Sequence, residues 1–322
     1  MKKIIFQISL VLTATLLFTV SCKKADDDTG MISQSDSDKL LVSTTVGSTA
    51  IAFGAVFENL IADSLARVEF CREFTFPIRY FDDLSGYFFT QAFDGWNVAY
   101  PTNEDLVGTY LWDLQDPEDN YFIRSMSDIA ENDGSGFLEY YWNNPATGEN
   151  EKKLSFIHAI PGIEYYIGSG FYIRSSDPKI TLLESNMEIS KNASKSFAQG
   201  IAAVFESTYT NSSDRSVFCK TLLDQIKFFE DNSGYFFLVD LDGNCISHGA
   251  NSSLEGTDVS DLQDSKDVYF IRDMIALAED PGYGFLEYYW NNPSSGEDEK
   301  KMTYVHKLPD LNYFIGAGVY IR

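Results

Sequence analysis

The sequence is poor in basic residues. It has 24 lysines and arginines against 48 aspartates and glutamates, which gives a formal net charge of −24 at pH 7. Because nucleic-acid binding needs clustered Lys and Arg against phosphate, this balance argues against nucleic acid as a partner and against broad adhesion to anionic lipid. A small anion held by one or two local cations remains compatible with the charge.

The sequence also lacks the short motifs of common enzymes and cofactor sites. It has 3 histidines, and it contains no Cys-x-x-Cys, His-Glu-x-x-His, Gly-x-Ser-x-Gly or phosphate-cradling glycine loop. Residues 240–244 have the composition of a calcium loop but lack its distal glutamate, so we interpret them as a turn. We therefore predict no enzymatic activity, no cofactor and no metal site.

Long hydrophobic runs are rare as well, and only residues 4–20 approach the ~18 apolar residues that span a bilayer. Two lysines precede this run and small residues with Cys22 end it, which is typical of a secretory signal and resembles a bacterial lipoprotein box. We predict a signal peptide over 1–22, lipidation of Cys22 and a flexible acidic tether over 23–35. The alternative is an uncleaved N-terminal membrane anchor.

This N-terminus predicts an extracytoplasmic protein, lipid-anchored to the cell membrane or the outer membrane. The sequence leaves open whether the protein faces the periplasm or the cell surface.

Three further cysteines are present: Cys71, Cys219 and Cys245. Export permits disulfides, but Cys71 and Cys219 occupy equivalent positions of an internal repeat, which favours small buried side chains on helices. A disulfide between Cys219 and Cys245 stays open at this point.

Most of the chain is an internal repeat. Residues 121–174 and 269–322 share, in order, Tyr-Phe-Ile-Arg, Gly-Phe-Leu-Glu-Tyr-Tyr-Trp-Asn-Asn-Pro, Lys-Lys and Ile-Gly-x-Gly-x-Tyr-Ile-Arg, and every pair is 148 positions apart. A period this long indicates a duplicated domain rather than a solenoid. We predict a first domain over 36–174, a linker with the start of a helix over 175–192, and a second domain over 193–322.

Each copy reads as a long helix, two strands, a short helix and three strands, from the spacing of its apolar residues and its turn residues. Hairpin-length links between consecutive strands predict an α+β fold with an antiparallel sheet. In the first copy the expected elements are a helical region over 36–80, a strand over 86–93 followed by an Asp-Gly hairpin, a helix over 121–132, and strands over 136–142, 152–160 and 164–173.

The shared motifs, together with Gly-Tyr-Phe-Phe at 86–89 and 234–237, resemble the single-Cache type 2 domain. This is an extracytoplasmic sensor module with a PAS-like sheet, and the resemblance covers roughly 45–174 and 193–322. It implies two tandem Cache domains, each with a five-stranded antiparallel sheet, a long N-terminal helix and a pocket for a small molecule, often a short carboxylate.

Two arginines are candidate anchors for such a ligand. Arg124 and Arg272 each follow Tyr-Phe-Ile, and a guanidinium offers a planar, permanently charged fork that matches a carboxylate. Tyr121 and Tyr269 lie one turn earlier on the same helical face. The alternative is an arginine paired with a nearby acidic residue.

Two lysine pairs open a strand in each copy. Strand periodicity places Lys152 and Lys153 on opposite faces, and likewise Lys300 and Lys301. Lys153 and Lys301 align with a lysine of the Cache family, so we expect them on the pocket face; a solvated strand end is the alternative.

Aromatic residues complete the predicted sites, although most aromatic residues at such positions form core. The second copy has more polar side chains suited to binding a charged small molecule. It has His248 where the family often has His-Pro, and Tyr304 where the first copy has a phenylalanine. The predicted ligand-binding residues are Tyr87, Tyr121, Arg124, Tyr140, Trp142 and Lys153 in the first copy, and Tyr235, His248, Tyr269, Arg272, Tyr288, Trp290, Lys301 and Tyr304 in the second.

The sequence thus predicts a lipid-anchored sensor or solute-capture protein that binds a short organic acid or a similar metabolite. Arg272 and Lys301 would neutralise the acid, and aromatic side chains would enclose it. Because no kinase or chemotaxis sequence follows, a signal would need a separate signalling or transport partner. The alternative function is a structural or protein-interaction repeat with non-functional pockets.

Overall fold

The computed structural model describes residues 30–321, so the predicted signal peptide and Cys22 lie outside the described residues. Two domains of the same topology follow one another along the chain. The first contains β1 (Met31–Ser33), α1 (Gln34–Asn59), α2 (Ser64–Thr75), β2 (Phe89–Ala92), β3 (Asn97–Ala99), a 3-10 turn (Glu104–Leu106), α3 (Phe122–Asp128), a π-helical turn (Ile129–Asp133), β4 (Ser135–Asn143), β5 (Asn150–Ala159) and β6 (Tyr165–Tyr172). The second contains β7 (Lys179–Thr181), α4 (Leu182–Ser207), α5 (Ser212–Leu223), β8 (Phe236–Asp240), β9 (Cys245–His248), a 3-10 turn (Ser252–Leu254), α6 (Phe270–Glu279), β10 (Tyr283–Asn291), β11 (Asp298–Lys307) and β12 (Tyr313–Tyr320).

Each domain has one five-stranded antiparallel sheet, as predicted. The strand order is β3-β2-β6-β5-β4 in the first domain and β9-β8-β12-β11-β10 in the second. Hairpins at the predicted Asp-Gly turns join β2 to β3 and β8 to β9, and Gly95 and Gly243 take the positive φ angles of 87° and 93° that these turns need. The predicted α+β fold class is therefore confirmed.

The N-terminal helical region consists of two helices rather than one. The side chain of Ser33 caps α1 by accepting a hydrogen bond from the backbone N–H of Asp36, and Asp63 caps α2 through the N–H of Ala66. Residues 31–35 belong to β1 and α1, so the predicted flexible tether over 23–35 extends too far. Strand β1 pairs with β7 at the start of the second domain.

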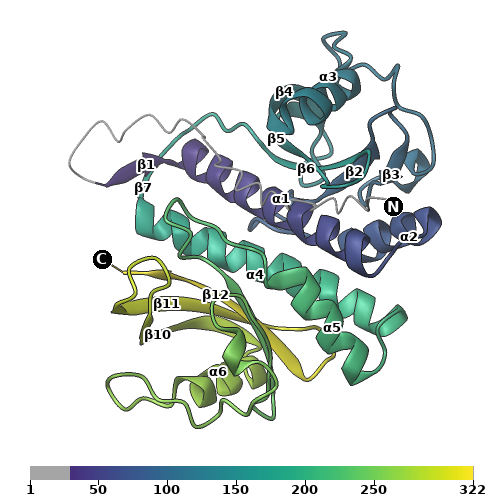
Figure 1. Cartoon of the computed structure of the whole chain (residues 1–322). Coiled ribbons are helices and arrows are strands. Elements are labelled where there is room, and N and C mark those ends of the chain that lie inside the picture. Colours follow the sequence, from purple (N-terminus) through teal and green to yellow (C-terminus); the bar gives the residue numbers. More distant parts are fainter. Residues whose placement is uncertain (1–29, 322) are drawn as a thin grey trace, which may run out of the picture.

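The long helices lie between the two sheets (Figure 1). α1 packs on the first sheet and α4 on the second, and one continuous apolar core includes residues from both helices and both sheets. α1 is long and apolar enough to cross a membrane, but 72% of its most apolar window is buried in this core. Each domain also has a smaller apolar cluster of its own, on the face of its sheet that points away from the long helices.

Equivalent residues of the two repeats meet at the domain interface. Ser37 and Ser185 are hydrogen-bonded through their Oγ atoms at 2.8 Å, and the ring centroids of Phe70 and Phe218 are 6.0 Å apart. Each of these pairs is 148 positions apart, as is the pair of isoleucines facing one another across β1 and β7. The domains are therefore related by a pseudo-twofold axis, as the subunits of a symmetric dimer would be.

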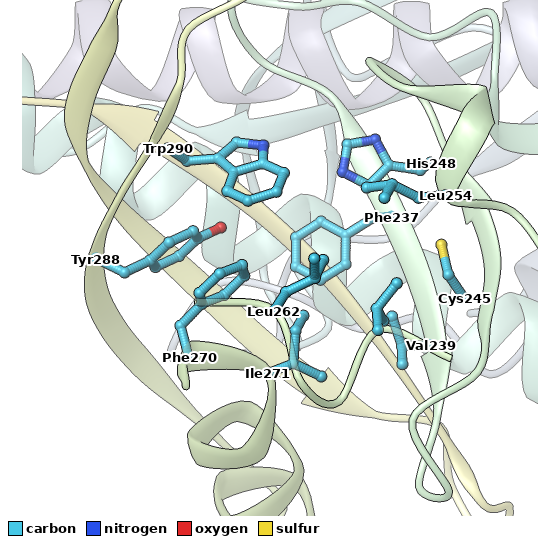
Figure 2. A pocket seen from close by; sticks show the side chains of 11 residues that line it. Phe237, Val239, Cys245, His248, Leu254, Leu262, Phe270, Ile271, Tyr288 and Trp290 are labelled. Atoms are coloured by element: carbon cyan, nitrogen blue, oxygen red, sulfur yellow. The ribbon is translucent and has the colours of Figure 1, made fainter. Parts of the chain in front are cut away.

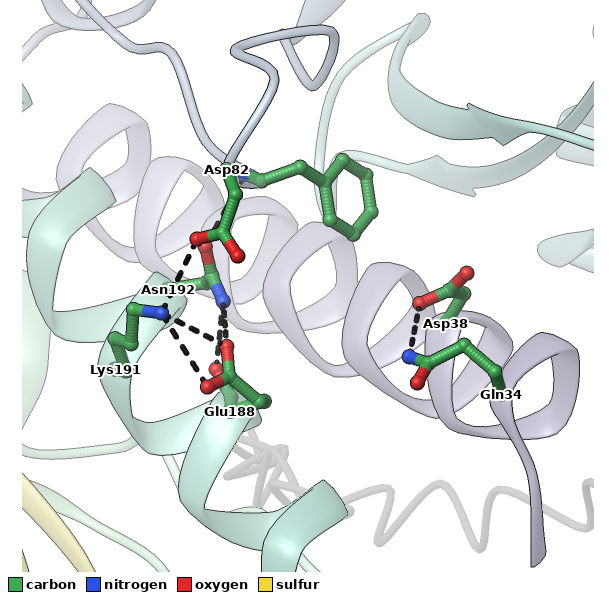
Figure 3. A network of polar contacts seen from close by, with 7 residues as sticks. Gln34, Asp38, Asp82, Glu188, Lys191 and Asn192 are labelled. Atoms are coloured by element: carbon green, nitrogen blue, oxygen red, sulfur yellow. Dashed lines mark hydrogen bonds and ion pairs between the residues drawn. The ribbon is translucent and has the colours of Figure 1, made fainter. Parts of the chain in front are cut away.

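A polar network adds to this interface on one side (Figure 3). Lys191 of α4 forms ion pairs with Glu188 at 3.2 Å and with Asp82 of the first domain at 3.4 Å. Asn192 accepts a hydrogen bond from the backbone N–H of Phe81. These contacts tie α4 to the segment that precedes the first sheet.

Cys71, Cys219 and Cys245 are free and buried. The interpretation of Cys71 and Cys219 as small buried side chains on helices is confirmed, and the Cys219–Cys245 disulfide does not form.

Candidate functional site

The candidate site lies on the face of the second sheet that points away from the long helices. Residues 249–269 are here called the cover segment. This segment and the helix that follows it, α6, both contribute side chains to this face (Figure 2). Between these elements and the sheet is a cavity of about 20 Å³, which has room for little more than one water molecule. It is lined by Phe237, Val239, Cys245, His248, Leu254, Val259, Leu262, Phe270, Ile271, Tyr288 and Trp290.

Lys301 of β11 is completely buried on this same face, because it alternates with Lys300 along the strand. Its Nζ lies 3.8 Å from the ring centroid of Tyr235 and 4.9 Å from that of Tyr320. Among the described residues Nζ has no hydrogen-bond partner. Burial, and then the charge of Lys227, lowers the pKa of Lys301 well below its usual value.

His248 contributes a neutral hydrogen-bond donor to the cavity. Its Nδ1 accepts hydrogen bonds from the backbone N–H groups of Asn251 at 2.9 Å and Ala250 at 3.3 Å. Burial, and then the charge of Lys301, lowers the pKa of His248 to about 3. The neutral ring therefore carries its proton on Nε2.

Aromatic rings form the walls of the cavity. The rings of Phe270 and Tyr288 are stacked at 4.4 Å, and Trp290 meets Phe270 edge-on at 5.1 Å. The hydroxyl of Tyr288 is within hydrogen-bonding distance of Thr303 Oγ1, at 3.1 Å. These contacts fix the rings in a well-packed wall with few free polar atoms.

Gly316 makes room for one wall residue. A Cβ atom at this position would lie 2.3 Å from the Phe237 ring, and the equivalent Gly168 stands in the same relation to Phe89. These glycines therefore allow β8 to place Phe237 against β12, at the base of the cavity.

The first domain has a related but different arrangement. Lys153 is also fully buried, with Nζ 4.0 Å from the ring centroid of Tyr87. Burial alone would raise the pKa of the Tyr87 hydroxyl, but the charge of Lys153 and the hydrogen bonds to the hydroxyl together outweigh burial and lower the pKa. Tyr100 replaces His248, and its hydroxyl is 2.8 Å from that of Tyr87. Tyr140 completes this wall beside Trp142.

Comparison with known proteins places this geometry in a family. A family model described as "Cache domain" matches residues 71–200 and 196–322, which is most of the chain. The chain belongs to the Cache domain family. The predicted tandem Cache organisation is thereby confirmed.

Two curated relatives are sensory proteins. The chain is 38% identical over 88 residues to the sensor histidine kinase MctS of Rhizobium johnstonii, a match that covers 27% of this chain and 19% of the relative. It is 32% identical over 91 residues to the methyl-accepting chemotaxis protein McpP of Pseudomonas putida, covering 28% and 17%. The chain thus matches less than a fifth of either relative's length.

Among solved structures, a Cache chemosensory domain studied for its recognition of carboxylic acids is 26% identical to this chain. That match covers 43% of this chain and 92% of the solved chain, with a TM-score of 0.36. Cache domains are extracytoplasmic sensor domains that bind small molecules, which agrees with the predicted sensory and ligand-binding role at this coarser level.

The predicted arginine anchors lie outside both Cache sites. Arg272 is ion-paired with Asp261, its side chain is 54% exposed, and its guanidinium stacks on the exposed ring of Tyr269 at 4.3 Å. Arg124 is likewise paired with an aspartate and stacked on Tyr121. In this structure Arg272 therefore does not line the cavity, and both arginines form the alternative arrangement, a pair with a nearby acidic residue.

Tyr304 is also on the wrong face for the predicted role. It faces Phe285 across the strand pair, with ring centroids 4.9 Å apart. Since Lys301 lies on the face of the sheet that carries the cavity, a residue three positions later must point to the α4 side of the sheet. This prediction is corrected accordingly.

The structure adds residues that sequence analysis did not select. Phe270 stacks on Tyr288, Thr303 lies beside the Tyr288 hydroxyl, and Tyr320 lies against Lys301. The signal for Thr303 was available, because it is two positions from Lys301 on the same strand face. Within residues 30–321 no group of three or more His, Cys, Asp and Glu could hold a metal ion.

Proposed function

We propose that the protein is an exported, lipid-anchored sensor or solute-capture protein whose second Cache domain binds a short organic acid. The observation that carries this proposal is the Lys301 ammonium group, which is buried among aromatic rings without a hydrogen-bond partner in the described part of the chain. Leaving such a group unsatisfied is costly. A ligand carboxylate would supply both the countercharge and the missing acceptor.

His248 would provide the second contact to this carboxylate. A neutral imidazole with its proton on Nε2 can donate to an anion without adding a charge of its own. The rings of Tyr288 and Trp290 would exclude water and limit the length of the acid. In this mechanism Arg272 makes no contact with the ligand.

The cavity of about 20 Å³ corresponds to a closed site, so binding requires an outward movement of the cover segment and α6. The ligand would enter between this cover and the sheet, and closure would then remove its carboxylate from water.

The second domain is the better binding site of the two. Nζ of Lys153 likewise has no hydrogen-bond partner in the described part of the chain, but the Tyr87 hydroxyl partly offsets the effect of burial on the pKa of Lys153. Tyr100 also occupies the place of the His248 donor. Lys301 has no comparable internal partner, and Lys227 adds a second positive charge nearby.

Anchoring and signal transfer are parts of the same proposal. Cys22 would carry the lipid. This part of the proposal is supported by the small residues before Cys22 and by the acidic segment after it. A separate membrane signalling or transport protein would receive the liganded state, since the relatives are sensory proteins.

A second candidate function, a structural or protein-interaction repeat, is favoured by the small volume of the cavity. This function requires filled sheet faces and no response to small molecules.

Thermal shift with short mono- and dicarboxylic acids, and with the corresponding neutral amides, tests the proposal. We expect at least one acid, but not its amide, to raise the melting temperature of the wild type, Lys153→Met and Arg272→Ala. The same acid should leave Lys301→Met unchanged, because the countercharge is gone. Retained stabilisation of Lys301→Met would refute the assigned anchor, and no shift with any acid would favour the interaction repeat.

A further inference from the structure

Two acidic residues connect the cover segment to the helical side of the second domain. Asp224 is the C-terminal cap of α5, and Glu255 follows the 3-10 turn of the cover segment. The two carboxyl groups accept hydrogen bonds from adjacent residues of β9, Ser247 and His248, and so lie close together. Two carboxyl groups can hydrogen-bond to one another only when one of them carries a proton.

Each carboxyl group is also held by a neighbouring strand or helix. Asp224 accepts a hydrogen bond from Ser247 Oγ at 2.7 Å, and Glu255 accepts one from the backbone N–H of His248 at 3.1 Å. Lys220 forms an ion pair with Glu255 at 3.1 Å, and the Glu255 side chain is only 8% exposed. The pair therefore joins α5, β9 and the cover segment at one point.

The first domain shows that the fold does not require this pair. At the positions equivalent to Asp224 and Glu255 it has Phe76 and Val107, 148 residues earlier in each case. Arg72 replaces Lys220, and its Nε donates to the carbonyl of Val98 instead. The first domain thus has the same two elements with apolar side chains at these positions, which makes it an internal control.

We propose that Asp224 and Glu255 form a proton-operated latch that holds the cover segment closed in mildly acidic conditions and releases it as the pH rises. With one proton shared, the pair is a hydrogen bond in a largely dry setting. Without that proton, two carboxylates face one another at the C-terminal end of α5, where a negative charge is already disfavoured.

The surrounding charges set the pH at which the latch operates. Burial, together with the charge of Glu255, raises the pKa of Asp224 to about 6, against the attraction of Lys220. Lys227 also faces Asp224, and the buried thiols Cys219 and Cys245 lie close to the pair. Since the pKa is raised in the folded state, the stabilisation is fully present below about pH 4 and is lost as the pH rises through about 6.

The latch is placed to control the cavity. Leu254, next to Glu255 in the chain, lines the cavity, and so does His248, whose backbone N–H binds Glu255. Release would therefore loosen one wall of the cavity and a candidate ligand donor together. This inference goes beyond ligand binding and does not depend on it.

Amide hydrogen exchange on the full chain tests the latch without any ligand. The backbone N–H of Gly256 donates to Cys245, and the equivalent N–H of Gly108 donates to Asn97 in the first domain. After correction for the intrinsic pH dependence of exchange, we expect the Gly256 amide to lose roughly tenfold protection between pH 5 and pH 8. The Gly108 amide should keep its protection.

Two variants complete the test. Asp224→Asn keeps a neutral donor opposite Glu255 at every pH, and Asp224→Phe with Glu255→Val introduces the first domain's apolar pair. We expect protection of Gly256 to become independent of pH in both. A pH response that persists in either folded variant, or an equal response at Gly108 in the wild type, would overturn the latch.

Discussion

At the level of single residues, the two domains differ in how each buried lysine is accommodated. Lys153 lies over the ring of Tyr87 and lowers the pKa of the Tyr87 hydroxyl, whereas the hydroxyl of Tyr235 in the second domain lies near that of Tyr320. The neighbours of the Lys301 ammonium group are the rings of Tyr235 and Tyr320 and the positive charge of Lys227. A duplicated site has thus diverged by exchange of its polar partners, while its lysine and its aromatic walls are retained.

Buried histidines give a prediction for acid stability. Burial, and then the charge of Lys195, lowers the pKa of His306 to about 4. In the unfolded chain this histidine takes up a proton below about pH 6.5, which the folded chain resists down to about pH 4. Its stabilisation is therefore present above pH 6.5 and falls as the pH drops from 6.5 towards 4.

We expect the free energy of unfolding to fall by roughly 2 kcal/mol between pH 7.5 and pH 5 on account of His306. Urea denaturation at both pH values measures it, with His306→Gln beside the wild type. The variant should lose correspondingly less stability on acidification. Equal losses in the two proteins would show that His306 takes up its proton in the folded state.

Part of the site was accessible from sequence. Strand alternation placed the two lysines of each pair on opposite faces, and the resemblance to the Cache family selected Lys153 and Lys301 for the pocket face. The same rule places Tyr304 on the opposite face from Lys301, because an odd number of positions separates them. The outward direction of Arg272 was not accessible, since it depends on how α6 rotates against the sheet.

At the level of elements, Gly316 of β12 gives a second prediction. Gly316→Ala should lower the free energy of unfolding by about 1–3 kcal/mol, because the new methyl group would overlap the Phe237 ring. Gly168→Ala is the matched change in the first domain and should cost a similar amount through Phe89. Urea denaturation measures both, and wild-type stability of Gly316→Ala would mean that Phe237 moves freely within the cavity.

The strands were predictable from sequence, and the interface elements were not. Alternation of apolar residues and the Asp-Gly turns located β2 to β6 and their counterparts. The pairing of β1 with β7 joins segments about 148 positions apart, so no local pattern marks it. The tether was therefore predicted to continue through residues that form a strand.

At the scale of the whole molecule, the duplication has produced an internal dimer. α1 is apolar around most of its circumference, which is expected of a helix buried on several sides. One side of α1 meets its own sheet and another meets α4, its partner across the pseudo-twofold axis. A displacement of either sheet at its site would therefore be passed to the long helices that the two domains share.

This shared core predicts that both domains unfold as one unit. Phe270→Ala removes a ring that is 3% exposed and contacts only second-domain residues among its ring partners. We expect a loss of about 3 kcal/mol in the free energy of unfolding. Because the domains share one core, the slowest-exchanging amides of β6 should lose as much protection as those of β12. If the amides of β12 lose protection and those of β6 do not, the two domains are independently stable.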